Sequence, residues 1–159
     1  MLNLIKRIQS VPANHIQMYN QDSFYEAFVS DLHLAEYEVV IESPFITIKR
    51  ITALIPILTD LRSRGVKIII NTRDPIEHDV DYEVQAIDSV AVLQSMDIEV
   101  LYTARHHRKL AVIDRTIVWN GSLNILSQND SCEIMWRTSS LELADRLLEF
   151  INLKRYTRR

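Results

Sequence analysis

Residues that can act on a phosphate ester gather between positions 106 and 133 of the chain. An imidazole there can attack phosphorus or carry a proton, and a lysine offers a fixed positive charge. A serine and an asparagine add neutral hydrogen-bond donors, and an aspartate can fix the tautomer of an imidazole. The spacing is His107-x-Lys109-x4-Asp114-x6-Gly121-Ser122-x-Asn124.

This spacing suits a hairpin of two strands. In a strand, alternate side chains share a face, so His107 and Lys109 would point the same way. The apolar residues 110–113 would continue that strand into a core, and the β-branched and aromatic residues 116–119 predict the returning strand. Because a hairpin brings its end back to its beginning, residues 121–124 would lie beside the imidazole.

Two short segments bound the returning strand. Asp114-Arg115 has the composition of a turn. Gly121 permits close approach of two backbones where the strand ends. The donors Ser122 and Asn124 would therefore come back towards the histidine and the lysine.

The pattern resembles the HKD signature of the phospholipase D superfamily, and all six of its specified positions match. Residues 41–45, Ile-Glu-Ser-Pro-Phe, resemble a Ser-Pro-Phe/Tyr segment of the superfamily, and residues 68–73 resemble its second strand and the following loop. Glu133 resembles the acidic residue that follows the motif in many members. The resemblance implies an α/β phospholipase D-like domain.

The resemblance also implies a mechanism that needs two histidines. One imidazole attacks phosphorus to give a phosphohistidine, and a second protonates the leaving group and later activates water. The superfamily pairs two motifs across a two-fold axis, whereas His15, His33 and His78 are not followed by a lysine two places on. The implied protein is a homodimer with one shared site, and no metal or cofactor is expected.

The resemblance also implies a role for each of the two acidic residues. Asp114 is expected to be structural or to fix a tautomer, and Glu133 is the preferred acceptor for orienting His107. The expected catalytic residues are His107, Lys109, Ser122, Asn124, Asp114 and Glu133.

Residues around the motif are candidate substrate contacts, each with a simpler alternative. Ser43 would otherwise only cap a turn, and Arg73 would be an ordinary loop residue. Arg105 and Arg108 would contact phosphate or remain solvated. The expected substrate-binding residues are Ser43, Arg73, Arg105 and His106.

A zinc site would be the alternative use of His106, His107 and Cys132. Consecutive side chains of a strand diverge, and no fourth ligand stands at a recognisable spacing. The sequence therefore predicts no metal.

The whole chain has 159 residues, 47% of them apolar, which predicts one domain with a sizeable core. The formal net charge of −3 argues against a uniformly basic nucleic-acid-coating protein but permits a local basic cleft. Cys132 is the single cysteine, which fits a reducing compartment. Residues 1–9 lack the apolar run of a signal peptide, and no segment reaches membrane-spanning length. We expect a cytoplasmic protein without membrane contact.

Helix and strand patterns alternate along the chain, which predicts a mixed, largely parallel sheet with helices on both faces. Gly65 would end the second helix, and Pro56 would kink or restart it. Residues 1–20 form an arm, a linker or an edge element, and residues 21–159 form the domain. The predicted helices are 22–35, 49–64 and 82–96, and the predicted strands are 38–41, 66–70 and 98–102.

The end of the chain should add one more strand and one more helix. Residues 132–136 predict the strand, and Trp119 and Trp136 are interpreted as core residues. Ser139-x-x-Glu142 has the spacing of a capping box. The helix that follows places Leu143, Leu147 and Phe150 on one side.

A single-motif chain without exposed apolar loops resembles the nuclease branch of the superfamily most. We therefore expect a metal-independent phosphodiesterase acting on nucleic acid, with DNA endonuclease activity favoured, in a homodimer fused to or associated with a helicase or restriction module. One alternative is a non-catalytic, dimerising nucleic-acid-binding module. Another is a phospholipid-processing enzyme.

Overall fold

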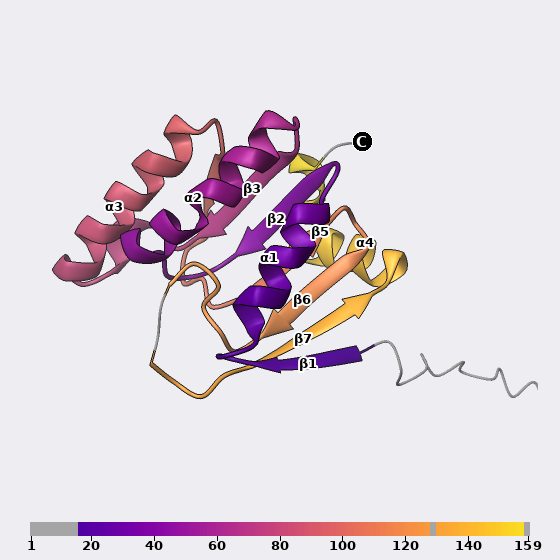
Figure 1. Cartoon of the computed structure of the whole chain (residues 1–159). Coiled ribbons are helices and arrows are strands. Elements are labelled where there is room, and N and C mark those ends of the chain that lie inside the picture. The colour runs from indigo at the N-terminus through magenta and orange to yellow at the C-terminus, as the bar shows by residue number, and fades with distance from the viewer. Residues whose placement is uncertain (1–15, 128–129, 158–159) are drawn as a thin grey trace, which may run out of the picture.

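Seven strands form the central sheet of the structure: β1 (Ile16–Asn20), β2 (Glu38–Glu42), β3 (Lys67–Thr72), β4 (Glu99–Tyr102), β5 (Leu110–Ile113), β6 (Ile117–Gly121) and β7 (Ile134–Ser139). The computed structural model describes residues 16–127 and 130–157 (Figure 1). Within them the strands are hydrogen-bonded in the order β1-β7-β6-β5-β2-β3-β4. The helices are α1 (Phe24–Leu34), α2 (Ile48–Ser63), α3 (Val80–Ser95) and α4 (Leu141–Phe150), with the short 3-10 helices η2 (Pro75–Glu77) and η3 (Lys154–Tyr156).

The sheet changes from parallel to antiparallel at β2. Val39 lies in parallel register with Ile68 of β3 on one side and in antiparallel register with Ile113 of β5 on the other. The parallel strands β2, β3 and β4 are joined by the crossover helices α2 and α3, as parallel neighbours require. The mixed α/β sheet expected from the sequence is confirmed, but in the described residues it is mostly antiparallel and not largely parallel as predicted, because only β2, β3 and β4 pair in parallel.

Helices cover both faces of the sheet (Figure 1). Residues of α1, α2 and α3 pack on one face around Phe28, Leu58 and Trp119. On the other face, Ala144 and Leu148 of α4 pack against the strands. Successive residues of β2 enter different cores, so this strand is buried on both sides, which explains its continuous apolar sequence.

The ends of α2 follow the sequence signals. The hydroxyl of Thr47 accepts a hydrogen bond from the Arg50 amide at the first turn. Gly65 has a φ of 77° just after the last turn, as predicted for the residue that ends this helix. Pro56 lies inside α2, which continues from Ile48 to Ser63.

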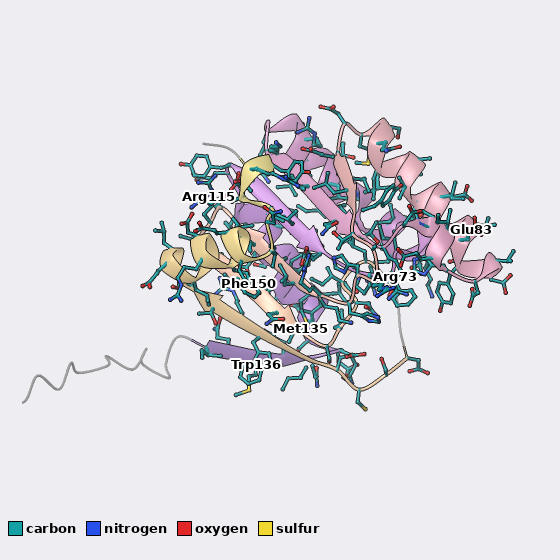
Figure 2. The ribbon with its side chains drawn as sticks, turned by 180° about the vertical axis from the view of Figure 1, so that it is seen from behind. Arg73, Glu83, Arg115, Met135, Trp136 and Phe150 are labelled. Atoms are coloured by element: carbon teal, nitrogen blue, oxygen red, sulfur yellow. The ribbon has the colours of Figure 1, made fainter. Side chains whose placement is uncertain are left out.

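The two chain ends differ from the predictions in detail. Residues 16–20 form the edge strand β1, in line with the edge element that was one of the alternatives for residues 1–20, and residues 1–15 lie outside the described part. In α4 the capping serine is Ser140. The side chain of Phe150 is 88% exposed, so the buried side of this helix is the one with Ala144 and Leu148 (Figure 2). Trp119 is a core residue as predicted, whereas Trp136 is 44% exposed on β7. Among the described residues, no helix is both long and apolar enough to cross a membrane.

Candidate active site

The β5–β6 hairpin brings the two ends of the motif together. Asp114 and Arg115 both have positive φ angles, 50° and 53°, which suit a tight turn between antiparallel strands. Leu110 then pairs with Asn120. The end of β6 therefore lies beside the start of β5, as the spacing predicted.

Gly121 is required by the close approach of β6 and β7. A Cβ atom at this position would lie 2.1 Å from the carbonyl oxygen of Ile134 and 2.8 Å from Cα of Met135. Since both contacts are to backbone, no side-chain movement could relieve them. The predicted close approach is confirmed, and it fixes the position of Ser122, the next residue.

His107 and Lys109 lie in the loop before β5, because regular strand structure begins only at Leu110. The imidazole is exposed, and its Nε2 lies 3.0 Å from the guanidinium Nη2 of Arg73. A guanidinium only donates, so Nε2 is the acceptor and the ring proton occupies Nδ1. Arg73 also donates to the carbonyl of His106 at 2.9 Å, which anchors its side chain beside the imidazole. The structure thus brings the expected substrate-binding arginine to the expected nucleophile.

Lys109 supplies a second cation beside the backbone of His107. Its Nζ donates to the carbonyl of His107 at 2.8 Å. Burial lowers the pKa of Lys109, the positive charge of Arg73 lowers it further, and Glu133 opposes both. Two cations close together favour a bound anion, which would relieve their mutual repulsion.

Ser122 and Glu133 form the opposite side of the site. The Ser122 hydroxyl donates to the Glu133 carboxylate and accepts from the Ile134 amide at 3.1 Å. Ser131 donates to the other carboxylate oxygen at 2.5 Å. The predicted contact of Glu133 with His107 is not among these bonds, so the acid holds the serine in place and stays within electrostatic range of Lys109.

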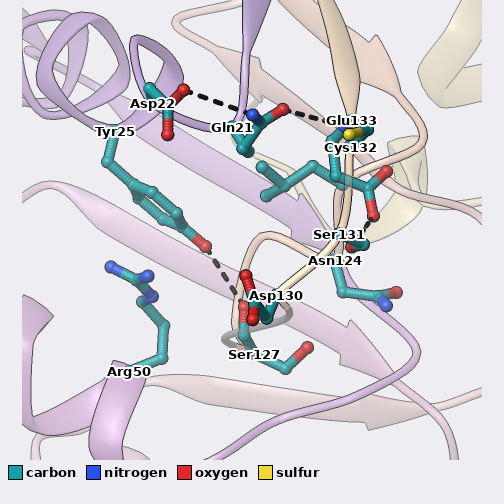
Figure 3. Close-up of a pocket in the computed structure, with 11 residues that line it drawn as sticks. Gln21, Asp22, Tyr25, Arg50, Asn124, Ser127, Asp130, Ser131, Cys132 and Glu133 are labelled. Carbon is teal, nitrogen blue, oxygen red and sulfur yellow. Dashed lines mark hydrogen bonds between the residues drawn. The ribbon is translucent and has the colours of Figure 1, made fainter.

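Asn124 brings a buried polar atom to the site. It is 9% exposed, and its Oδ1 is buried without a hydrogen-bond partner among the residues that the structure describes. The side chain lines two cavities, one of about 340 Å³ towards Tyr25 and Glu133 and one of about 450 Å³ towards Phe45 and Tyr82. Figure 3 shows the first cavity, with Asn124 and Glu133 at its border. A buried amide without a partner is costly in a fold and is common where a ligand completes the bonding.

Asp114 is not brought to this cluster, because it lies at the other end of β5. Its carboxylate accepts three backbone amides at the start of β2, from Glu36 at 2.7 Å, Tyr37 at 2.8 Å and Glu38 at 2.9 Å. Figure 2 shows its neighbour Arg115 far from Arg73. Of the two roles considered for Asp114, the geometry supports the structural one.

Two expected substrate contacts are buried instead. The Ser43 side chain is fully buried, donates to the Phe45 carbonyl at 2.9 Å and accepts the Leu126 amide at 3.1 Å. The His106 side chain is also fully buried. Neither can reach a substrate at the surface of this chain. Arg105 is exposed, and its backbone amide donates to Glu77 at 2.9 Å.

A buried carboxylate that the sequence did not single out supports the loop before β5. Glu42 accepts from Arg108 at 2.5 and 2.8 Å and from Asn71 at 2.7 Å, and His106 Nε2 lies 3.6 Å away. Burial alone would raise the pKa of Glu42, but the nearby His106 ring and the hydrogen bonds from Arg108 and Asn71 outweigh it and hold the pKa below the ordinary value. An acid at the end of an apolar strand was the only sequence signal for this network. Among the described residues, no group of three or more His, Cys, Asp or Glu side chains could hold a metal ion.

The fold and the cluster around His107 define a phospholipase D-like domain. The family model described as cardiolipin synthase, PLD-like domain, matches residues 28–153, and the chain belongs to this family. No curated protein matches the chain.

Solved structures share the fold at low sequence identity. Nuc from Salmonella typhimurium, a phospholipase D family member, is 18% identical, with a TM-score of 0.68 over 91% of this chain and 95% of its own. NucT from Helicobacter pylori is 18% identical, with a TM-score of 0.67 over 89% and 96%. TrmBL2, an archaeal chromatin protein with a novel mode of DNA binding, is 13% identical, with a TM-score of 0.58 over 91% of this chain and 53% of its own.

Proposed function

We propose that the protein is a metal-independent phosphodiesterase that hydrolyses nucleic acid, specifically a DNA endonuclease, through a phosphohistidine. The observation that carries this proposal is the exposed His107, whose Nε2 lies 3.0 Å from Arg73 and whose backbone carbonyl accepts from the amine of Lys109. A nucleophile with two adjacent cations meets the main requirement of phosphoryl transfer, which is to stabilise charge on the non-bridging oxygens. Family membership supports the same chemistry.

In the proposed reaction, the bound phosphodiester replaces His107 as the acceptor for Arg73, which frees the Nε2 lone pair. Nε2 attacks phosphorus, the P–N bond forms, and the P–O bond to the leaving group breaks. A second imidazole donates a proton to the leaving alkoxide and then takes one from the water that hydrolyses the phosphohistidine. The Lys109 amine and the Nδ2 amide of Asn124 donate to the oxygens of the phosphoryl group throughout.

The second imidazole is proposed to come from another copy of this chain. One chain contains one HKD pattern, and an isologous pair would place two copies of His107 across a two-fold axis. Nucleic acid is the proposed substrate because TrmBL2, which shares the fold, is described as a DNA-binding chromatin protein. Association with a helicase or restriction module is part of the same proposal and would supply targeting to DNA.

The test is incubation of the purified protein with supercoiled plasmid and with single-stranded DNA in EDTA, together with a mass measurement in solution. We expect cleavage by a dimer, and loss of cleavage in His107→Ala and Lys109→Ala. His33→Ala is the matched control, because His33 is an exposed histidine on α1. A strict requirement for added magnesium, or a monomer that cleaves, would contradict the mechanism. DNA binding without cleavage would favour a non-catalytic binding module, and hydrolysis confined to phospholipid vesicles would favour a lipid substrate.

A further inference from the structure

Three aromatic rings gather beside the candidate active site. Phe45 follows β2, His78 follows η2, and Tyr82 lies in the first turn of α3. The ring centroids are 5.0 Å apart for Phe45 and His78, 5.6 Å for Phe45 and Tyr82, and 6.4 Å for His78 and Tyr82. All three line the cavity of about 450 Å³, together with Arg73, Glu77, Asp79 and Asn124.

These rings are placed to contact a ligand. Within the described residues, neither apolar core includes Phe45, His78 or Tyr82. Tyr82 is 40% exposed, and the other two rings are half-buried. Burial lowers the pKa of His78 and the charge of Arg73 lowers it further, so this ring is uncharged at neutral pH. The cavity thus offers flat, neutral rings to whatever enters it.

The aromatic cavity is continuous with the phosphate end of the site. The guanidinium of Arg73 lies 5.3 Å from the centre of the Phe45 ring and contacts Nε2 of His107 at 3.0 Å. Asn124, a motif residue, lines the same cavity. A phosphate bound by Arg73 at His107 would therefore have its neighbouring substituent at the mouth of the cavity.

The charges around the cavity define what that substituent can be. The carboxylates of Glu77 and Asp79 disfavour a second phosphate and are poor neighbours for an acyl chain. Carboxylates do accept hydrogen bonds from amino groups, and aromatic rings stack on flat heterocycles. A volume of about 450 Å³ is ample for one heterocyclic base. These properties together describe a nucleobase.

We propose that this cavity binds one unpaired nucleobase next to the scissile phosphate, and that the preferred substrate is accordingly single-stranded nucleic acid. The inference rests on the proposed function for the phosphate it places at His107. A base inside a duplex is stacked and paired, so it cannot enter the cavity unless it leaves the helix. Stacking tolerates any base, so the cavity selects for single strands more than for sequence.

The experiment compares binding of two ligands of equal charge in EDTA at fixed salt, using the full chain carrying His107→Ala to prevent turnover. One ligand is a fluorescent DNA trinucleotide, and the other is the same sugar-phosphate backbone with every base removed. We expect the base-containing ligand to bind at least about fivefold more tightly by fluorescence polarisation. Tyr82→Ala should erase the difference, and Tyr82→Phe, which keeps the ring, should retain it.

Tyr37→Ala is the matched control, because Tyr37 is an exposed tyrosine at the opposite end of β2, where it should not affect the preference for bases. Equal affinity for the two ligands, or no binding of either, would overturn the proposal. A change in mass from dimer to monomer in Tyr82→Ala would also overturn it, because the rings would then belong to a contact between copies. Binding reports on the cavity even if no substrate is cleaved, so failure of the proposed hydrolysis remains a separate result.

Discussion

The two ends of the β5–β6 hairpin belong to one sequence motif but differ in how their polar groups are bonded. At the turn, Asp114 accepts three backbone amides, and Arg115 donates to Glu38 and Thr157 at 2.8 Å each. At the open end, the His107 imidazole is exposed, and Asn124 has a buried oxygen with no partner in the described part of the chain. One end has its bonds satisfied within the chain, and the other has bonding capacity left for a ligand.

This difference shows that one sequence motif can contain residues that hold the fold and residues that are available to a ligand. The turn end fixes where β5 lies against β2, and through the strand it fixes where the loop of His107 and Lys109 emerges. The spacing between Lys109 and Asp114 is then the length of a strand, because β5 occupies the residues between them. Substitutions at the two ends should accordingly affect different measurements.

The largest expected effect is on catalysis at the open end. His107→Ala should lower the rate of hydrolysis of a diester such as bis(p-nitrophenyl) phosphate by about a thousandfold or more, because the nucleophile is lost. The free energy of unfolding should change by no more than about 0.5 kcal/mol, since the side chain is exposed. Urea denaturation and initial rates measure the two quantities. If His107→Ala lowered the free energy of unfolding by as much as it raised the activation free energy of hydrolysis, the proposed difference between the two ends of the hairpin would be wrong.

The next effect concerns stability at the turn end. Asp114→Ala should lower the free energy of unfolding by about 3 kcal/mol, because three amides lose a charged acceptor and an alanine must adopt a positive φ. Urea denaturation checks the loss. Asp114→Asn, which keeps one acceptor oxygen and tolerates the backbone angle, should lose less. The control is Asp88→Asn on the exposed side of α3, which should change little. If Asp114→Asn abolished hydrolysis while remaining fully stable, Asp114 would have a chemical role after all.

A smaller, pH-dependent effect is expected at Glu42, which lies beneath the open end. Its lowered pKa means that its contribution to stability is complete above the ordinary value of 4.5 and is lost as the pH falls through the folded-state pKa. Glu42→Gln should cost about 2 kcal/mol at pH 7, and the difference from the unsubstituted protein should shrink in acid. Denaturation at several pH values between 7 and 3 would measure this. A difference that stayed constant over that range would mean that Glu42 is not the charged acceptor.

The smallest effect compares two arginines at opposite ends of the hairpin. Arg115→Ala should lower the free energy of unfolding by about 1 kcal/mol, because it removes partly exposed bonds to Glu38 and Thr157. Arg105→Ala at the open end should leave stability unchanged and weaken binding of a single-stranded oligonucleotide. Thermal denaturation and a salt titration of binding measure the two outcomes. If the two substitutions lowered the free energy of unfolding equally, the turn end would not be the more important end for stability.

Local patterns were sufficient to predict most elements and the hairpin that carries the motif. The hairpin, its turn at Asp114, the helix end at Gly65 and the close approach at Gly121 follow from short-range signals, and all are confirmed. Each depends on backbone geometry within a few residues, which sequence encodes directly.

Burial was harder to predict, because it depends on which segments cover a residue. His106 was interpreted as a substrate contact from strand alternation, but residues 106–109 are not in a strand, and the imidazole is buried beside Glu42. Trp136 was interpreted as core, yet it lies on β7 near the sheet edge and remains exposed. Phe150 is exposed because α4 packs through Ala144 and Leu148. No local sequence pattern shows which distant segment will pack over a given residue.

The change from parallel to antiparallel pairing at β2 has a consequence for the recovery of hydrolysis during refolding. Val39 must pair with Ile113, far along the chain, before the loop that carries His107 is held against Arg73 from the parallel half. Closing so long a stretch of chain is slow compared with forming a helix or a hairpin. We therefore expect circular dichroism to recover ahead of hydrolysis after dilution from urea. The recovery of hydrolysis would then report on the formation of the long-range pairing between β2 and β5.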